Sequence, residues 1–231
     1  MFHPVQSKKL HQQVFEQIQQ LIVDGELKSG DRLPSERDLC EILHVGRNSI
    51  REALRALEAL GIIESHQGGG NYITSDIGSG LLEPLALNFR LHGGTFNDLW
   101  EVRRALENEA AILAAGRITA EQKTALQSLL DAFRQCDREA ESVRLDKEFH
   151  LKIAECSGNV MLRTFLSAIS SLLESAIQNG RKGIMRAFAD RSELVAMHEA
   201  IGEAILNGDS RAASAAVEHH FQMILDNLSV R

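Results

Sequence analysis

Three histidines and one aspartate interrupt the apolar stripes of helices expected in the C-terminal part of the chain. These helices cover roughly residues 142–155, 191–206 and 211–228, where apolar residues recur at spacings of three and four. The polar residues that share the stripes are Asp146, His150, His198 and His220. Buried polar groups need either many hydrogen-bond partners or one shared cation, so these four residues are candidate metal ligands.

Asp146 and His150 lie four residues apart, so one helix face carries both side chains, one turn above the other. In this arrangement a single helix can supply two ligands to one ion. A lone histidine in an apolar stripe is more often a hydrogen-bonded core residue than a ligand. Three histidines together with an aspartate favour the ion, and a hydrogen-bonded core without metal is the alternative.

The last of these helices contains two adjacent histidines. His219 lies about 100° round the helix axis from His220. It falls on the side of Ala212, Ala215 and Gln222 rather than in the apolar stripe. We therefore predict His220 as the ligand and keep His219 as its rival.

An arginine interrupts the apolar stripe of the helix expected from Phe96 to about Gly116. Arg103 shares that stripe with Leu99, Leu106, Ala110 and Leu113. A buried guanidinium is costly unless it meets an anion, whereas an arginine near the rim of a helix can extend its charge into water. The residues alone leave both interpretations open for Arg103.

The composition restricts the classes of protein to which the chain can belong. The 231 residues include three cysteines without a close-spaced pair, which excludes a disulfide framework or a zinc ribbon and favours a reducing cytoplasm. No apolar run approaches the roughly 18 residues of a membrane span, and the first residues lack the apolar segment of a signal peptide. We expect a cytoplasmic protein outside the membrane. A net charge of -7 argues against coating nucleic acid by bulk charge, but permits a local basic face.

The periodicity predicts a mainly α protein of two domains. Strand-forming runs around a glycine cluster occur only at 62–73, as in a hairpin, and helical stripes recur almost throughout the remainder. Turn-forming residues interrupt the pattern between 76 and 94. We expect a first domain at 1–75, a linker with a short helix at 76–94 and a helical domain at 95–231.

The first domain has the pattern of a winged helix-turn-helix. A helix is expected from about residue 7 to 24, and Ser35 can cap a second helix whose third residue, Asp38, completes a capping box. A turn at 44–46 leads into a third helix at about 47–60, which precedes the glycine-tipped hairpin. In this layout the second helix of the motif enters the DNA major groove.

Arg47, Arg51 and Arg55 recur at four-residue spacing on the outer face of that third helix. Such a stripe is often a solvated face paired with neighbouring glutamates, here Glu52 and Glu58. Residues 1–75 contain eight Lys/Arg against ten Asp/Glu, so a general basic footprint is missing. The arrangement of the arginines, and not the net charge of the domain, favours DNA.

The segments 22–39, 45–54, 60–63 and 68–72 resemble the DNA-binding domain of GntR-type bacterial transcription regulators. The resemblance implies operator contacts by three arginines, a glycine at the wing tip in the minor groove, and phosphate contacts by two serines. In this order the residues are Arg37, Arg47, Arg51, Gly68, Ser35 and Ser49. An arginine can read guanine with two hydrogen bonds. The chain departs from the family at Gly46, where a serine is usual, so one phosphate-binding hydroxyl is lost.

The segments 101–107, 146–150, 157–159, 198–201, 208–209 and 216–221 resemble the FCD effector-binding domain of the FadR branch, an antiparallel all-α helical bundle. The resemblance implies a divalent metal on Asp146 and the three histidines, with a small organic acid completing its coordination. Zn²⁺ is our choice, and Ni²⁺ and Mn²⁺ also suit these ligands. The resemblance also places Arg103 at the effector carboxylate. Asn159 is either a further effector contact or the cap of the next helix.

Together these features predict a homodimeric transcription repressor that binds palindromic operator DNA and is released by a small carboxylate, such as a hydroxy acid, sugar acid or dicarboxylate. One rival keeps the DNA-binding role but replaces the metal with a metal-free pocket. The other is a metal-dependent enzyme, because such a site could activate water. We expect no glutamate beside the ligands to act as a general base, and therefore no enzyme.

Overall fold

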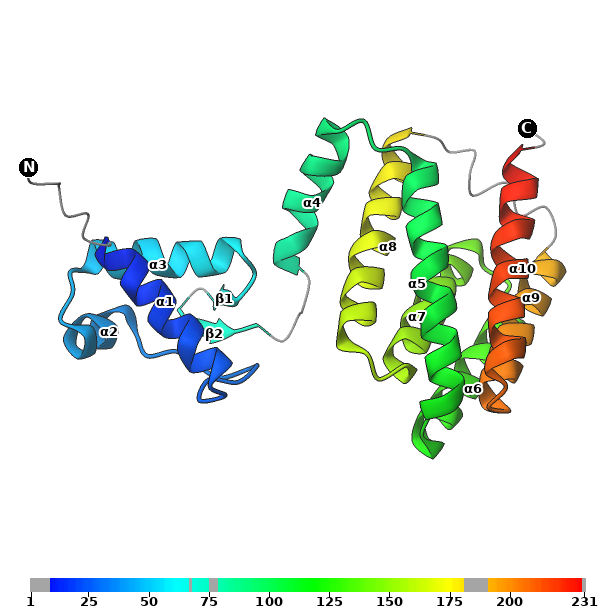
Figure 1. Ribbon diagram of the computed structural model, residues 1–231, viewed down its shortest axis with the longest axis horizontal. Helices are drawn as coiled ribbons and strands as arrows, with labels where there is room; N and C mark the ends of the chain where they lie inside the picture. Colours follow the sequence, from blue (N-terminus) through cyan, green and yellow to red (C-terminus); the bar gives the residue numbers. More distant parts are fainter. Residues whose placement is uncertain (1–8, 67, 75–78, 181–190, 230–231) are drawn as a thin grey trace, which may run out of the picture. The chain divides into compact units, whose positions relative to one another are not determined.

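The computed structural model describes residues 9–66, 68–74, 79–180 and 191–229, which form ten helices and a two-stranded sheet (Figure 1). The chain divides into two compact units, Met1–Leu85 and Ala86–Arg231. The division falls within α4 (Ser79–Leu91). No helix among the described residues is long and apolar enough to cross a membrane.

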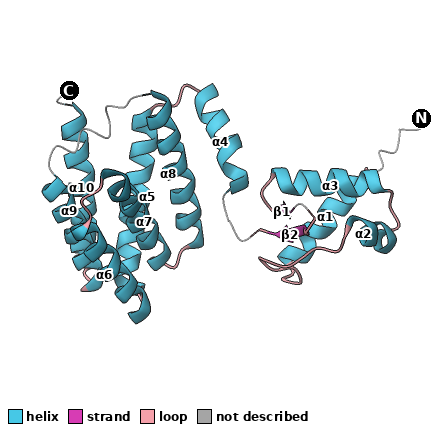
Figure 2. Ribbon diagram, turned by 180° about the vertical axis from the view of Figure 1, so that it is seen from behind, coloured by secondary structure: helices cyan, strands magenta, loops and turns pink. Residues whose placement is uncertain are grey.

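The first unit is a three-helix domain with a β-hairpin. Its helices are α1 (Leu10–Val23), α2 (Glu36–Leu43) and α3 (Arg47–Ala59), and both α1 and α2 pack against α3. Strands β1 (Ile63–His66) and β2 (Gly70–Ile73) form the hairpin beside these helices (Figure 2). They pair antiparallel, with Ile63 opposite Ile73 and His66 opposite Gly70. The winged helix-turn-helix predicted from the sequence is therefore confirmed.

Local chemistry explains where α2 and α3 begin. The Ser35 hydroxyl accepts the Asp38 backbone N–H at 3.2 Å, and the Asp38 carboxylate accepts the Ser35 N–H in return, which is the expected capping box. His44 ends α2 in a left-handed conformation with φ 53°, and Gly46 begins α3 without a side-chain cap. The turn between the two helices therefore spans only residues 44–46.

The core of the first unit holds one face of α3 inward. Its buried members come from all three helices, the loop between α1 and α2, and the hairpin: Val14, Ile18, Leu33, Leu39, Ile50, Ala53, Leu54, Leu57, Ile63 and Ile73. Ile50, Ala53 and Leu57 have no exposed surface. The opposite face of α3 therefore presents its arginines to solvent.

The second unit is an all-α bundle of α5 (Phe96–Arg117), α6 (Ala120–Gln135), α7 (Glu139–Cys156), α8 (Val160–Gly180), α9 (Arg191–Leu206) and α10 (Ser210–Ser229). Short connections make neighbours such as α7 and α8, or α9 and α10, antiparallel. α5 contacts α7, α8, α9 and α10 and is central to the bundle, whereas α6 packs against α7 and α9.

Small residues allow the helices of the bundle to approach closely. Ala110, Ala111 and Ala114 of α5 are completely buried. A Cβ added at Gly202 of α9 would lie 2.5 Å from the Leu130 side chain of α6. The bundle core is therefore dense, and polar groups within it have little access to water.

The Thr119 capping box at the start of α6 yields a stability prediction. Thr119→Ala removes the hydroxyl that accepts a hydrogen bond from the Gln122 backbone N–H at 3.2 Å. We expect the free energy of unfolding to fall by about 1 kcal/mol, measured by urea denaturation followed by circular dichroism. The control is Thr124→Ala, whose hydroxyl bonds only the Ala120 carbonyl of the same helix. The control should stay within about 0.5 kcal/mol of the parent, and equal losses in both variants would contradict the capping role.

Candidate metal centre and nucleic-acid interface

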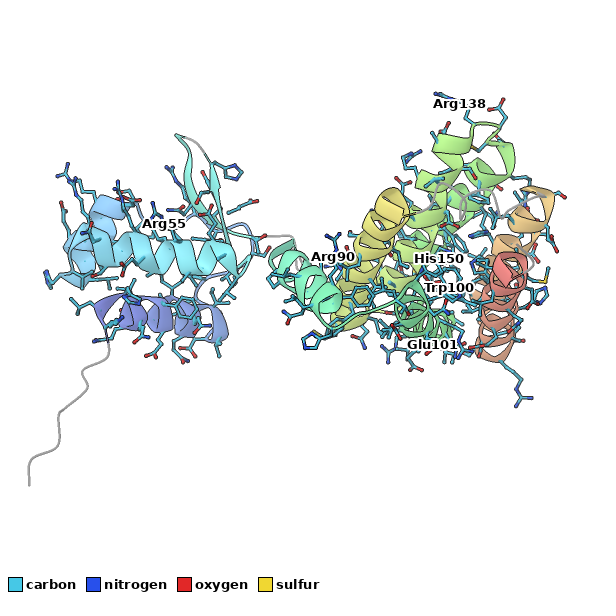
Figure 3. The ribbon with its side chains drawn as sticks, turned by 90° about the horizontal axis from the view of Figure 1, so that it is seen from above. Arg55, Arg90, Trp100, Glu101, Arg138 and His150 are labelled. Carbon is cyan, nitrogen blue, oxygen red and sulfur yellow. The ribbon has the colours of Figure 1, made fainter. Side chains whose placement is uncertain are left out.

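Three helices of the bundle bring one histidine each to a common point. His150 of α7, His198 of α9 and His220 of α10 are 4%, 1% and 2% exposed. One ring nitrogen from each lies within 4.8 Å of the other two. Figure 3 shows His150 among the helices of the bundle, whereas Glu101 lies on an outer face. The geometry places the three histidines in one buried cluster, hereafter the histidine cluster.

Asp146 of α7 adds a carboxylate to the histidine cluster. Its Oδ1 atom lies 3.0 Å from His198 Nε2 and 3.7 Å from His150 Nε2. The side chain is 33% exposed, so the cluster meets solvent on this side. Burial raises the pKa of Asp146, but the charges of His150 and His198 outweigh burial and hold the pKa well below its usual range. The structure thus places Asp146 against two of the three clustered histidines.

The outer nitrogens of two histidines are held by acceptors. His150 Nδ1 lies 2.6 Å from Glu107 Oε2, and His198 Nδ1 lies 2.7 Å from the Leu194 carbonyl oxygen. If Nδ1 donates its proton to these acceptors, Nε2 of each ring carries the lone pair. The lone pairs then belong to the nitrogens beside Asp146.

The inner nitrogens of the histidine cluster lack hydrogen-bond partners. Among the described residues, none forms a hydrogen bond with His150 Nε2, His198 Nε2 or His220 Nδ1. His198 Nε2 is close to Asp146, but the contact lies off the hydrogen-bond direction. Unsatisfied imidazole nitrogens beside a carboxylate fit a divalent cation, because nitrogen and oxygen ligands of this kind bind zinc and related metals.

Aromatic rings and helix phase complete the surroundings of the cluster. The ring centroids of Phe133 and Phe149 lie 4.6 Å and 5.0 Å from the ring centroid of His198. His220 is buried and His219 is exposed, so the preference for His220 from helix phase agrees with the structure.

Glu107 of α5 is a buried residue of the site that the sequence analysis missed. Its side chain is 6% exposed, with Oε2 at His150 and Oε1 at 2.5 Å from Arg103 Nε. The expectation that no glutamate lies beside the ligands is therefore wrong. The available signal was its spacing of four residues from Arg103, which permits an ion pair along one helix.

The charges around Glu107 stabilise one another. Burial raises the pKa of Glu107, but the charges of Arg103 and His150, with the hydrogen bonds that both donate, lower it to about 2. Burial lowers the pKa of His150, but the charges of Glu107 and Asp146 outweigh burial and raise it to about 9, so a cation at Nε2 would take the place of a proton there. Burial lowers the pKa of His220 well below its usual range, which leaves that ring neutral.

Arg103 is partly buried and paired instead of extending into water. Its side chain is 13% exposed, and its guanidinium carbon lies 5.8 Å from the Trp100 ring and 6.0 Å from the Phe221 ring. Of the two interpretations, the one in which the guanidinium meets an anion describes the structure, with Glu107 as that anion. The buried Trp100 Nε1 beside it has no hydrogen-bond partner among the described residues.

Asn159 acts as a helix cap in the structure. Its Oδ1 atom accepts the backbone N–H groups of Met161 and Leu162, at 3.0 Å and 3.2 Å. The side-chain oxygen is thus engaged at the start of α8. The effector contact implied by the resemblance stays a prediction.

The arginines of the first unit form an exposed surface. Arg47, Arg51 and Arg55 all project from the outer face of α3, and Figure 3 labels Arg55 there. Arg51 Nε pairs with Glu36 Oε2 of α2 at 2.9 Å, and Arg37 Nε pairs with Glu41 at 3.0 Å. Exposed pairs of this kind contribute little to stability, so DNA phosphates or bases could replace the glutamates.

The expected partners of this arginine surface require a correction. The alternative interpretation of the stripe pairs its arginines with Glu52 and Glu58 of the same helix, but the Glu52 carboxylate lies 3.0 Å from His11 Nδ1 of α1. Within the stripe, Arg51 is therefore paired across helices, with Glu36 of α2.

The other predicted DNA contacts lie at turns of the same unit. Gly68 has φ 74° at the tip of the hairpin, a conformation that favours glycine. Ser35 caps α2, and Ser49 lies half-buried in the first turn of α3. A glycine tip lets the backbone approach a partner without a side chain between them.

Two family models match the chain and divide it as the two units do. The model described as "Bacterial regulatory proteins, gntR family" matches residues 10–73, and the "FCD domain" model matches residues 98–223. The first match contains the winged helix-turn-helix, and the second contains the histidine cluster.

Relatives match over nearly the whole chain. "HTH-type transcriptional regulator LutR" of Bacillus subtilis is 33% identical over 90% of this chain and 96% of its own length. "Putative L-lactate dehydrogenase operon regulatory protein" of Escherichia coli is 32% identical over 94% and 85%. The solved structure "Streptococcus agalactiae GntR" is 31% identical, with a TM-score of 0.72 and coverage of 95% and 99%. The matched families and relatives are regulators and not enzymes, and this chain belongs to the GntR family of bacterial transcription regulators, in the FadR-type branch that carries an FCD domain.

Proposed function

We propose that the chain is a homodimeric, one-component repressor whose affinity for a palindromic operator changes when a small organic acid binds at a divalent metal in the histidine cluster. The observation that carries this proposal is the set of three buried ring nitrogens without hydrogen-bond partners, at His150, His198 and His220. The fused winged helix-turn-helix supplies the DNA-binding half.

The metal is a better account of the histidine cluster than a hydrogen-bonded core. A buried polar atom without a partner costs about 1–3 kcal/mol, and the cluster contains three of them. A cation that takes all three nitrogens and the Asp146 carboxylate would remove these costs together. Zn²⁺ suits three imidazoles and one carboxylate, and Ni²⁺ or Mn²⁺ would use the same ligands.

The charges around the cluster favour an anionic effector. With neutral histidines, a divalent cation and Arg103 together exceed the negative charge of Asp146 and Glu107 by one unit. One carboxylate would neutralise this excess. A bound cation with open coordination positions would attract that carboxylate directly.

The neighbouring side chains suit a ligand that also bears hydroxyl or carbonyl oxygens. Trp100 Nε1 is a buried donor without a partner, and Arg103 lies over the same indole ring. An oxygen of the ligand would satisfy this donor. The name of the E. coli relative refers to an L-lactate dehydrogenase operon, and lactate is a small hydroxy acid. Hydroxy acids, sugar acids and dicarboxylates are therefore our candidate effectors, with Arg103 and Asn159 as further contacts.

The DNA-binding half would read each half-site from α3. Arg37, Arg47 and Arg51 would contact the operator, with arginine reading guanine in the major groove. Ser35 and Ser49 would contact phosphates, and Gly68 would enter the minor groove. A two-fold dimer calls for a two-fold operator. Effector binding would then alter operator affinity as a coupling between two sites.

Metal content tests the histidine cluster directly. Protein purified without chelator should contain about one divalent ion per chain by elemental analysis, and His198→Ala should lose most of it because one of three nitrogen ligands is gone. The control is His219→Ala, an exposed histidine on the same helix as His220. Unchanged metal content in His198→Ala would contradict the proposed ligand set.

Operator binding tests the arginine surface. Arg51→Ala should weaken binding to a selected operator fragment by about 1–3 kcal/mol, or roughly 5- to 150-fold in Kd, while keeping the metal. Fluorescence anisotropy at fixed salt measures this change. Arg104→Ala is the matched control, because Arg104 also forms an exposed ion pair, with Glu218, but in the bundle. Equal affinities of Arg51→Ala and the parent would show that α3 does not read the operator through this residue.

A further inference from the structure

We propose that Glu107 is a positioning residue that fixes His150 as a metal ligand, an inference that rests on the metal site of the proposed function. Glu107 is not one of the four ligands. It contacts His150 Nδ1, whereas the nitrogen beside Asp146 is Nε2. Its influence on a metal would therefore pass through the imidazole ring.

Both carboxylate oxygens of Glu107 are engaged. Oε2 lies 2.6 Å from His150 Nδ1, and Oε1 lies 2.5 Å from Arg103 Nε. Glu107 and His150 are each 4% exposed, so water does not compete for these contacts. The carboxylate therefore joins α5 to α7 at the level of the histidine cluster.

The contact decides which nitrogen of His150 can bind a cation. A neutral imidazole carries one N–H and one lone pair. A carboxylate is an acceptor only, so it keeps the proton on Nδ1 and leaves the lone pair on Nε2. Nε2 is the atom that lies beside Asp146 and lacks a hydrogen-bond partner among the described residues. Glu107 thus selects the tautomer that a metal needs.

His198 offers an internal comparison. Its Nδ1 atom lies 2.7 Å from the Leu194 carbonyl oxygen of its own helix, which is a neutral acceptor. The acceptor for His150 is charged and comes from a different helix. A carboxylate behind a ligating histidine orients the ring and increases the basicity of the ligating nitrogen. His150 is accordingly the histidine whose affinity for a cation depends most on a neighbouring side chain.

The positive charge of Arg103 offsets the energetic cost of burying the Glu107 carboxylate. A buried carboxylate without a countercharge would favour its neutral form and lose its strength as an acceptor. The Arg103 guanidinium lies against Oε1 and under the rings of Trp100 and Phe221, which keep it in place. One carboxylate therefore connects the arginine proposed for the effector with a proposed metal ligand.

The simpler explanation is an ion pair that merely holds α5 to α7. Such a pair would affect the stability of the metal-free protein and leave the affinity for zinc unchanged. The proposal requires a change in zinc affinity itself. The two explanations are separated by measuring both quantities on the same variants.

The experiment is a zinc titration of the full chain against a chromogenic chelator, with the melting temperature of the chelated protein measured in parallel. Glu107→Gln keeps the shape of the side chain but replaces the charged acceptor with a weak one. We expect its zinc Kd to rise by about 10- to 100-fold. The control is Glu218→Gln, which breaks the exposed ion pair between Arg104 of α5 and Glu218 of α10. It should leave zinc affinity unchanged.

A second pair of variants removes the effect of leaving Arg103 unpaired. Arg103→Met is compared with the double variant Arg103→Met/Glu107→Gln, so that neither protein contains an uncompensated buried guanidinium. Zinc Kd is again expected to be higher in the double variant, but by a smaller factor, because the Glu107 carboxylate without Arg103 is a weaker acceptor. This pair decides the question if Glu107→Gln alone does not fold.

The outcomes separate this inference from the proposed function. The parent and the Glu107 variants could bind zinc with equal affinity, even if the melting temperatures of the variants fall. That result would overturn the role of Glu107 and leave the metal site intact. A parent chain that binds no zinc would overturn the metal site and this inference with it.

Discussion

The ring nitrogens of three histidines inside the helical bundle need partners other than bulk water. The second unit depends on how this requirement is met. His150, His198 and His220 come from three different helices, and their buried ring nitrogens face one another. Asp146 supplies a carboxylate from the partly exposed side. A cation at this point would join α7, α9 and α10, which otherwise contact one another mainly through apolar residues.

The central helix α5 controls the electrostatics of this arrangement. Glu107 neutralises Arg103 along α5 and contacts His150 on α7. The same carboxylate thus contacts a guanidinium and an imidazole, and its removal would take the countercharge of Glu107 away from Arg103. Through these contacts, an anion that binds near Arg103 would change the electrostatic environment of the histidine cluster.

Helical periodicity predicted the faces of the helices well, but it did not predict their partners. The Ser35 capping box, the span of α9 and the burial of His220 instead of His219 follow from local spacing alone. The pairing of Arg51 with Glu36 joins residues fifteen positions apart, and Glu107 meets His150 across two helices. Such contacts depend on how helices pack, and the period of one helix carries no information about the side chain that faces it from another.

The central claim is that a metal in the histidine cluster provides the binding site of a small organic acid. The most direct measurement is a thermal-shift screen of the full chain against hydroxy acids, sugar acids and dicarboxylates, before and after removal of metal by a chelator. A ligand at a hundred times its Kd stabilises the folded state by about 2.7 kcal/mol. The account predicts that at least one acid raises the melting temperature and that chelation abolishes the shift. An acid that raises the melting temperature equally after chelation would contradict it.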